Sequence, residues 1–248
     1  MKKAVVVGGS SGIGLAITLK LISDDYKVII VDRENPDIQE KSVLENIEFI
    51  KMDLTQFDEK VFKELSDDLD ISLLMITAGF GRVTEFENIS LPEIENMFMV
   101  NSVAAIKIFS IFYKRIMDKK PFYSGVMGSI AGLVSSPLFS VYAATKAAVC
   151  RFTESVNIEL EETGTNNRIL NVSPGSIKGT KFNGGPNDLS LTDELAKNIL
   201  EHLYAQDDLF IPDYEEIFKD VIKRYQKDPH EYGLHSYEYK RKSGRIRS

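Results

Sequence analysis

Short apolar runs alternate along this chain with segments of helical periodicity. Strands buried on both faces are predicted at residues 4–7, 27–31, 47–52, 72–77, 123–127 and 168–172, with a short last strand at 209–211. Helices are predicted at 13–22, 61–69, 142–162 and 214–225, and residues 91–117 are predicted to form one long helix or two abutting ones. Such regular alternation predicts an α/β fold in which a doubly wound parallel sheet is flanked by helices on both faces.

Length and composition favour one domain. The chain has 248 residues without an internal repeat, a low-complexity tract or a linker rich in Pro, Gly and Ser, so residues 1–248 are predicted to form a single domain. The net charge of −7 disfavours a nucleic-acid partner, because phosphate recognition needs a basic surface. One cysteine, Cys150, excludes an internal disulfide and suits a reducing compartment.

Membrane insertion and secretion are not expected. The apolar run near the N-terminus is too short for a signal peptide and ends at Gly8. We find no segment that approaches the ~20 apolar residues of a membrane helix. A cytoplasmic protein without membrane contact is therefore expected.

A glycine-rich turn follows the first predicted strand and opens the first predicted helix. Glycines at this place permit a tight turn and let the backbone approach a pyrophosphate, and the helix N-terminus adds unpaired N–H groups. No Lys-Ser or Lys-Thr pair follows, which disfavours a P-loop. The turn therefore predicts a Rossmann-type dinucleotide site, with contacts from Gly8, Ser10, Ser11, Gly12, Ile13 and Gly14.

Asp32 ends the second predicted strand, at the distance from the turn where an acidic residue reaches the adenosine ribose. A carboxylate repels a 2′-phosphate, so Asp32 favours NAD(H). Arg33 follows directly and is able to hold such a phosphate, which keeps NADP(H) possible. The alternative reading of Asp32 is a loop carboxylate that caps the next turn.

Tyr142 and Lys146 lie four residues apart, on one face of a predicted helix. A nearby ammonium favours the phenolate, so we expect Lys146 to lower the pKa of Tyr142 toward neutrality and make it a proton donor and acceptor. The spacing by itself is common, and the alternative is a surface lysine beside a packed tyrosine.

Together these features resemble the short-chain dehydrogenase/reductase family, from Gly8 to Thr180. The turn fits the family pattern Gly-x-x-x-Gly-x-Gly, and Ser129 precedes Tyr142 by the family's usual thirteen residues. The resemblance implies that the catalytic residues are Asn101, Ser129, Tyr142 and Lys146. It also implies that further cofactor contacts come from Asp53, Leu54, Ala78, Gly79, Tyr142, Lys146, Pro174, Gly175, Ile177 and Thr180, and it implies no metal ion.

The implied reaction is hydride transfer between a nicotinamide and an alcohol or carbonyl carbon of a small molecule. In this scheme Tyr142 is the general acid or base, Lys146 also binds the nicotinamide ribose, and Ser129 polarises the substrate oxygen. Asn101 supports a proton path through water to Lys146. Taken singly, Ser129 is explained equally well as a cap, and Asn101 as a helix kink or an interhelical bond.

Two other functions remain open. Within the family, the alternative is an NADP-dependent carbonyl or 3-oxoacyl reductase. Outside enzymes, the alternative is an NAD-binding sensor or scaffold without turnover. The substrate identity and the physiological direction do not follow from the sequence.

The sequence departs from the family pattern in three places. Ile76-Thr77 replaces two asparagines, and Thr77 is expected to keep one hydrogen bond. Thr180 lies one place late after Pro174-Gly175, and the family's Asp-Gly-Gly ending is missing. Residues 212–248 are instead predicted to form a divergent helix and a basic tail.

The expected substrate walls are 80–83, 133–139 and 181–195, within a lid region of 176–200 in which 183–188 is flexible in composition. The tail at 237–247 is interpreted as a solvated end, or as a segment that docks on a neighbouring subunit or near an anionic substrate. The resemblance also implies a homodimer or homotetramer in which helices around 101–117 and 143–160 pair between subunits. Their apolar residues permit this pairing: Ile106, Phe109, Phe112, Val149, Phe152 and Val156.

Overall fold

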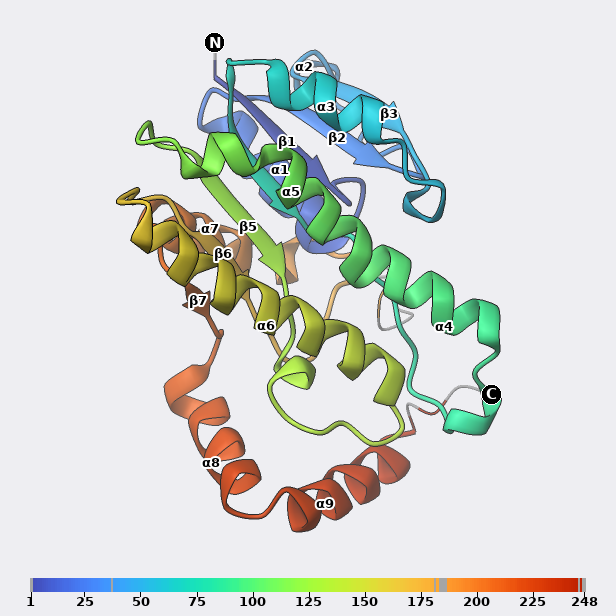
Figure 1. Ribbon diagram of the computed structural model, residues 1–248. Coiled ribbons are helices and arrows are strands. Elements are labelled where there is room, and N and C mark those ends of the chain that lie inside the picture. Colours follow the sequence, from blue (N-terminus) through green and yellow to red (C-terminus); the bar gives the residue numbers. More distant parts are fainter. Residues whose placement is uncertain (1, 37, 181, 183–186, 245, 247–248) are drawn as a thin grey trace.

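The computed structural model describes residues 2–36, 38–180, 182, 187–244 and 246 (Figure 1). Within them, seven strands form one parallel sheet in the order β3-β2-β1-β4-β5-β6-β7. The strands are β1 (Lys3–Val7), β2 (Lys27–Asp32), β3 (Ile47–Lys51), β4 (Ile71–Ile76), β5 (Tyr123–Met127), β6 (Ile169–Val172) and β7 (Leu209–Phe210). The chain winds outward from β1 to β3 and then in the other direction from β4, so the predicted doubly wound Rossmann topology is confirmed.

Helices cover both faces of the sheet. Helices α1 (Gly12–Ser23) and α7 (Asp193–Tyr204) pack on one face, and α3 (Glu59–Asp67), α5 (Ala104–Met117) and α6 (Ser140–Glu162) pack on the other. A further short helix, α2 (Lys41–Leu44), precedes β3. Because strand side chains alternate, Val5 and Val7 enter one core, and Ala4 and Val6 enter the other. The central strands β1, β2 and β4 are therefore almost entirely buried. The edge strand β3 exposes Glu48 and Lys51, so the prediction that it is buried on both faces is wrong.

Residues Leu91–Met117 form one continuous helical stretch. Helix α4 (Leu91–Phe98) passes through a π-helical turn, Met99–Val103, into α5. The stretch has 27 residues and contains an 18-residue window with a mean hydropathy of 1.3, so it is long and apolar enough to cross a membrane. The expectation that no segment would meet that test is wrong, because α5 carries many apolar side chains into the core of this chain.

Several of the residues expected to pair between subunits are buried in the core of this chain. Phe109, Phe112 and Val149 are at most 1% exposed and belong to the core between the sheet and helices α5 and α6. Their apolar character therefore does not by itself indicate a subunit interface. Phe152 and Val156 are half-buried, and oligomer formation stays a prediction.

Helix α7 was not expected, and it shortens the predicted lid. Ala196 and Ile199 are fully buried beneath α1 and the sheet, so residues 193–200 belong to the core. A lid within 176–200 is limited to the part that precedes α7. Of that part, residues 181 and 183–186 lie outside the described residues.

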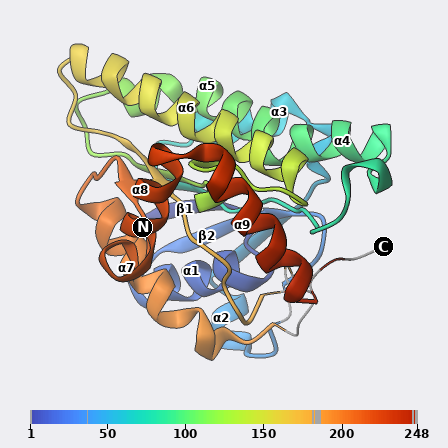
Figure 2. The same ribbon diagram turned by 90° about the horizontal axis from the view of Figure 1, so that it is seen from below.

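The C-terminal segment leaves the sheet after β7 and crosses its carboxyl edge. A π-helical turn, Tyr214–Phe218, leads into α8 (Lys219–Lys227), which confirms the helix predicted at 214–225. Helix α9 (Pro229–Lys242) follows and lies across the molecule between α6 and α1 when seen from below (Figure 2). The reading of the tail as a solvated end is wrong for this helix, because Lys240 Nζ donates to Ser136 Oγ at 2.6 Å and to the Pro137 carbonyl at 2.8 Å.

Candidate active site

A single cavity of about 1740 Å³ lies at the carboxyl ends of the strands and contains almost the whole predicted site. Every predicted cofactor-binding residue lines it, and so do Ser129, Tyr142 and Lys146. Ligand pockets of drug-sized molecules usually measure roughly 300–1,000 Å³. The cavity therefore has room for a dinucleotide and a second molecule.

The turn between β1 and α1 has the backbone shape of a phosphate cradle. Gly8 and Gly12 have φ angles of +86° and +53°, which residues with a side chain rarely adopt. A Cβ atom on Gly8 would lie 2.5 Å from the Ala78 nitrogen, and one on Gly14 would overlap the Gly8 carbonyl. Because these glycines have no side chain, β1, β4 and α1 approach one another closely at the turn. Backbone atoms therefore form this part of the cavity floor.

The cradle also contains unused hydrogen-bonding capacity. The Ser10 side chain is 5% exposed, and in the described part of the chain its hydroxyl has no hydrogen-bond partner. A buried hydroxyl without a partner is costly unless a ligand satisfies it. Together with the glycine backbone and the N-terminus of α1, this hydroxyl fits the pyrophosphate of a dinucleotide.

Asn187 already contacts the cradle. Its side-chain oxygen accepts a hydrogen bond of 2.7 Å from the Gly12 N–H, at the first turn of α1. Nearby, the Asp188 N–H donates to the Gly179 carbonyl at 3.0 Å, which holds the two ends of this loop together. Asn187 and Thr180 thus place the loop after β6 directly over the glycine turn, where the lid was expected.

Asp32 and Asp53 lie at the end of the cavity where the adenosine was expected. Asp32 accepts hydrogen bonds from the Ser10 N–H at 3.1 Å and from the Glu34 N–H at 3.3 Å, so it shapes the local turns as well as facing the cavity. Arg33 is exposed, and its Nε lies 3.7 Å from a Glu34 carboxylate oxygen. Hydrogen bonds from the Thr55 N–H and hydroxyl hold the pKa of Asp53 below its usual value.

Two departures from the family pattern have a structural explanation. The Thr77 hydroxyl lies 3.0 Å from the carbonyls of both Val7 and Gly8, so the expected hydrogen bond between β4 and the glycine turn is present. Thr180 lines the cavity with its side chain against Gly12, and its hydroxyl donates to the Ile177 carbonyl at 3.3 Å. A hydrogen bond from Thr180 to a nicotinamide stays a prediction.

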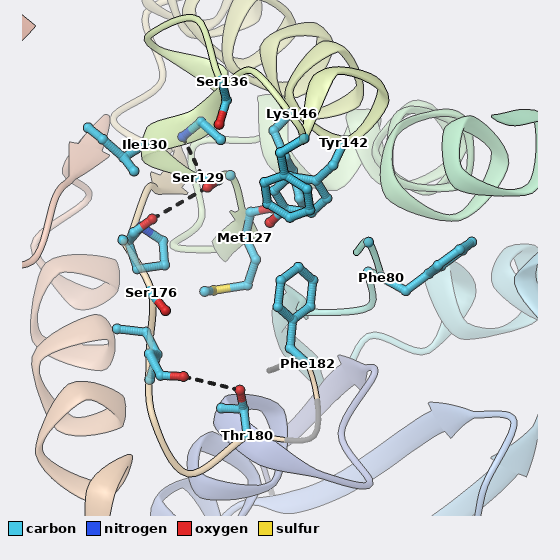
Figure 3. Close-up of a pocket in the computed structure, with 18 of the residues that line it drawn as sticks. Phe80, Met127, Ser129, Ile130, Ser136, Tyr142, Lys146, Ser176, Thr180 and Phe182 are labelled. Atoms are coloured by element: carbon cyan, nitrogen blue, oxygen red, sulfur yellow. Dashed lines mark hydrogen bonds between the residues drawn. The ribbon is translucent and has the colours of Figure 1, made fainter. Parts of the chain in front are cut away.

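Ser129, Tyr142 and Lys146 meet at the middle of the cavity (Figure 3). Ser129 follows β5, and Tyr142 and Lys146 extend from the first turns of α6. Lys146 Nζ lies 5.6 Å from the centre of the Tyr142 ring and donates to the Met127 carbonyl at 2.7 Å. Ser129 also accepts a hydrogen bond from the Ala131 N–H at 3.1 Å, so it is a cap as well as a member of this group.

The pKa of Tyr142 is shifted in the direction opposite to the one we expected. Burial raises the pKa of the phenol above its ordinary value, and the hydrogen bond with Ser129 opposes that rise. Burial also lowers the pKa of Lys146 to about 8. Desolvation thus outweighs the Ser129 hydrogen bond and sets the direction of the Tyr142 shift.

Asn101 lies behind the cavity wall. It occupies the π-helical turn and is 1% exposed. Its side-chain oxygen accepts from the Phe80 N–H at 2.9 Å, and its nitrogen donates to the Phe80 carbonyl at 2.8 Å and to the Thr145 hydroxyl at 3.0 Å. Asn101 therefore holds Phe80 and α6 in position, as the interhelical reading indicated, and its part in a proton path stays a prediction.

Aromatic side chains surround the Tyr142 ring. Phe139 stacks on it with ring centres 4.2 Å apart, and Phe182 lies 5.3 Å away at a tilt (Figure 3). Gly81 packs on the ring so closely that an added Cβ would lie 2.6 Å from it. These contacts fix the orientation of the phenol, and the walls predicted at 80–83 and 133–139 do contribute to the cavity.

The C-terminal helices contribute residues that sequence reasoning did not find. The Phe218 ring packs directly against Gly175, and Val221, Arg224, Tyr232 and other residues of α8 and α9 line the cavity. The signal for this was the density of tyrosines after residue 213, which argued against a disordered tail.

Comparison with known proteins agrees with this geometry. The family model described as short chain dehydrogenase matches residues 2–188. An uncharacterized oxidoreductase of Saccharomyces cerevisiae is 27% identical over 189 residues, which are 72% of this chain and 61% of that protein. A very-long-chain 3-oxoacyl-CoA reductase of Ajellomyces capsulatus is 29% identical over 173 residues, which are 65% of this chain and 51% of that protein. The chain thus spans between half and two thirds of the length of these curated relatives.

Three further proteins match over more of the chain. Retinol dehydrogenase 8 of Bos taurus is 27% identical over 234 residues, which are 89% of this chain and 73% of that protein. Among solved structures, a short-chain dehydrogenase of Streptomyces avermitilis superposes with a TM-score of 0.75 at 19% identity, covering 96% of this chain and all of the other. A short-chain dehydrogenase of Sphingobium yanoikuyae in complex with NADPH gives a TM-score of 0.70 at 20% identity, covering 92% of this chain and 96% of the other. On the match over residues 2–188, the chain belongs to the short-chain dehydrogenase/reductase family, a family of NAD(P)-dependent oxidoreductases.

Proposed function

We propose that the protein is an NAD(P)-dependent oxidoreductase that interconverts an alcohol and a carbonyl compound. The observation that carries this proposal is the meeting of Ser129, Tyr142 and Lys146 in the cavity that also contains the glycine cradle. A bound nicotinamide dinucleotide would supply or accept the hydride. The residues of the chain position the substrate oxygen and move its proton.

Each of the three side chains has a distinct part. The Ser129 hydroxyl binds the substrate oxygen, where negative charge develops as the hydride moves. The Tyr142 hydroxyl, which is hydrogen-bonded to Ser129, transfers the proton. Lys146 is held by the Met127 carbonyl beside the Tyr142 ring, and it stabilises negative charge on the phenol.

The two directions of the reaction need different protonation states of Tyr142. Burial raises the pKa of Tyr142, so the phenol carries its proton at neutral pH and is ready to donate it. Protonation of the oxygen of a carbonyl compound needs this form. The oxidative direction needs the phenolate, which becomes populated only at higher pH.

Tyr142→Phe tests the proposal. The substitution removes the proton donor and keeps the stacking with Phe139. General acid catalysis contributes about 10²–10⁴-fold, so kcat for carbonyl reduction is expected to fall by that factor. The dissociation constant for the cofactor is expected to change little, which serves as the control for folding. Unchanged turnover of an active ketone would contradict the assigned role.

We further propose that NAD(H) is preferred. Asp32 places a carboxylate at the adenosine end of the cavity, next to the Ser10 N–H, and this charge disfavours a 2′-phosphate. Asp32→Ser is expected to raise the affinity for NADPH about tenfold or more relative to NADH, measured by equilibrium binding of both. Arg33→Ser is the matched control, since loss of this cation weakens NADPH binding. If the wild type binds NADPH more tightly than NADH, the preference is wrong.

An NADP-dependent carbonyl or 3-oxoacyl reductase is the second candidate. It is supported by Arg33, which is exposed beside Asp32. The relative from Ajellomyces capsulatus carries the name of a 3-oxoacyl-CoA reductase, and a structural neighbour from Comamonas testosteroni is described as a bulky-bulky ketone specific alcohol dehydrogenase. The same binding comparison of NADH and NADPH separates this candidate from the first.

A sensor or scaffold that binds NAD without turnover is the third candidate. Such a protein has no chemical need for a serine, a tyrosine and a buried lysine in one cavity. Cofactor binding without turnover across a broad panel of ketones and alcohols would favour it over both enzymes.

A further inference from the structure

The C-terminal helices α8 and α9 close the substrate end of the cavity with side chains of the same chain. Phe218 lies against Gly175, beside the place expected for the nicotinamide. Gly233 of α9 faces the loop before α6, where an added Cβ would lie 3.7 Å from Ser135 Oγ, at ordinary van der Waals distance. Lys240 fixes the far end of α9 to Ser136 and Pro137. The two helices are thus a packed wall of the site.

This wall is apolar near the reacting group. Around Tyr142, the opposite walls present Phe80, Phe139 and Phe182, and α8 adds Val221. Cavities with mainly apolar walls bind apolar molecules, and a few polar groups determine the orientation of the ligand. The space between Tyr142 and α9 therefore fits an extended, mainly apolar substrate.

Cations gather farther along the same wall. Arg224 and Lys227 both line the cavity and lie three residues apart, on one face of α8. Within the described part of the chain, no carboxylate lies within ion-pair distance of either side chain. Lys178, His235 and Lys240 also face this cavity.

Two carboxylates, those of Asp228 and Glu231, line the same part of the cavity. Asp228 caps α9 and accepts hydrogen bonds from the N–H groups of His230 and Glu231 at 3.0 and 2.9 Å, and the Glu231 carboxylate lies 3.9 Å from His235 Nε2. Among the described residues, neither carboxylate forms an ion pair with Arg224 or Lys227. Burial raises the pKa of Tyr232, which is half-buried beside them, and the nearby Arg224 guanidinium opposes that rise.

We propose that Arg224, Lys227 and Tyr232 form a binding site for the anionic end of an elongated, mainly apolar substrate. The reacting carbon of this substrate lies at Tyr142, and a carboxylate or phosphate at its other end lies at α8. Guanidinium and ammonium groups bind both anions through charge-assisted hydrogen bonds. The inference rests on the proposed oxidoreductase function and names the substrate class of that site.

Two pairs of ketones test this site. The 4′-phosphopantetheine and pantetheine thioesters of one 3-oxoacyl chain differ only in a phosphate group. The second pair, 9-oxodecanoate and its methyl ester, differs in the carboxylate. KM and kcat are measured for all four, and binding to the cofactor-loaded protein is measured by calorimetry. A preference in the first pair alone identifies phosphate as the anion, and a preference in the second identifies carboxylate.

The variants are Arg224→Gln, Lys227→Gln and the double variant, with Lys223→Gln as the matched control. Lys223 is exposed on the same helix and does not line the cavity. In the double variant, KM and the dissociation constant for the charged member of a pair are expected to rise about tenfold, because charge-assisted hydrogen bonds are lost. The neutral member, kcat and the Lys223→Gln protein are expected to remain unchanged, since the lost interaction does not change during the reaction.

The inference is overturned if charged and neutral members bind the wild type equally, or if the double variant weakens both alike. The experiment distinguishes failure of this inference from failure of the proposed function. Failure to turn over any ketone refutes the oxidoreductase, whereas the calorimetric comparison still decides whether α8 binds an anion. Unchanged NADH affinity in the variants shows that they are folded.

Discussion

Lys146 is the residue at which function and stability oppose each other most clearly. Its side chain is 3% exposed, and burial lowers its pKa to about 8 from an ordinary value of 10.5. The Met127 carbonyl is its hydrogen-bond acceptor. A buried ammonium destabilises the folded chain, so its presence indicates a role that outweighs the cost.

Lys146→Met is expected to abolish turnover and to change the pH dependence of stability. Below pH 8 the folded wild type carries the buried charge and its full penalty. Between pH 8 and 10.5 the unfolded chain binds the proton that the folded chain has released, so wild-type stability rises with pH. The variant lacks this rise. Its free energy of unfolding relative to wild type should therefore fall by roughly 2–3 kcal/mol over that interval.

Denaturant unfolding of both proteins between pH 7 and 10.5 measures this difference. At pH 7 the relief of charge burial is partly offset, because the Met127 carbonyl loses its donor, at a cost of about 1–2 kcal/mol. The change with pH of the difference in unfolding free energy between variant and wild type does not depend on that offset. A difference that stays constant with pH would show that Lys146 is not the buried cation described above.

Single residues also show what spacing can predict. Tyr142, Lys146 and Ser129 are recognisable because their separations along the chain reflect one helix and one strand end. The packing of Gly81 and Phe139 on the Tyr142 ring is not recognisable, since it depends on loops from two places in the chain meeting at one point. The pKa of Tyr142 was mispredicted for the same reason: burial depends on the whole cavity wall.

At the scale of elements, the central strands were predicted well because β1, β2 and β4 are mainly apolar runs with nearly all side chains buried. Helix α7 has an apolar pattern that is as clear, with Ala196, Ile199 and Leu203 on one face, but the interpretation of residues 176–200 as a lid obscured it. Helix α9 has little such pattern. Its residues are mostly polar, and it contains Gly233, a residue that normally costs a helix about 1 kcal/mol.

The π-helical turn at Met99–Val103 is another feature that local sequence did not reveal. It inserts an extra residue in the turn that contains Asn101 and so directs this side chain toward Phe80 and Thr145. Single-turn π-helices are often found at functional sites. The helix boundary at residue 91 was predictable, because Ser90 caps α4 and Pro92 lies in its first turn.

At the scale of the whole molecule, the sequence predicts the sheet and the cofactor end of the cavity, and it leaves the substrate end open. The difference follows from chemistry. A dinucleotide needs the same backbone cradle in every chain that binds it, whereas α8 and α9 are shaped by a substrate that no local pattern describes.

The half-buried surface of α6 is the candidate site of self-association. Helices α5 and α6 lie side by side on one face of the sheet, and Phe109 of α5 stacks on Phe152 of α6 at 6.0 Å (Figure 1). Although Phe109 is buried, Ala148, Phe152 and Val156 form a half-buried stripe with four-residue spacing along α6. We propose that this stripe pairs with its copy in a second chain, because a contiguous apolar strip on a helix favours association.

Sedimentation equilibrium at micromolar concentration is expected to give a dimer or tetramer for the wild type. Ala148→Arg places a bulky cation in the half-buried stripe and is expected to lower the mass to that of one chain, because two such cations would face each other across a symmetric interface. Glu154→Arg introduces the same side chain on the opposite, exposed flank of α6 and should leave the mass unchanged. A wild type that sediments as a single chain would refute the interface.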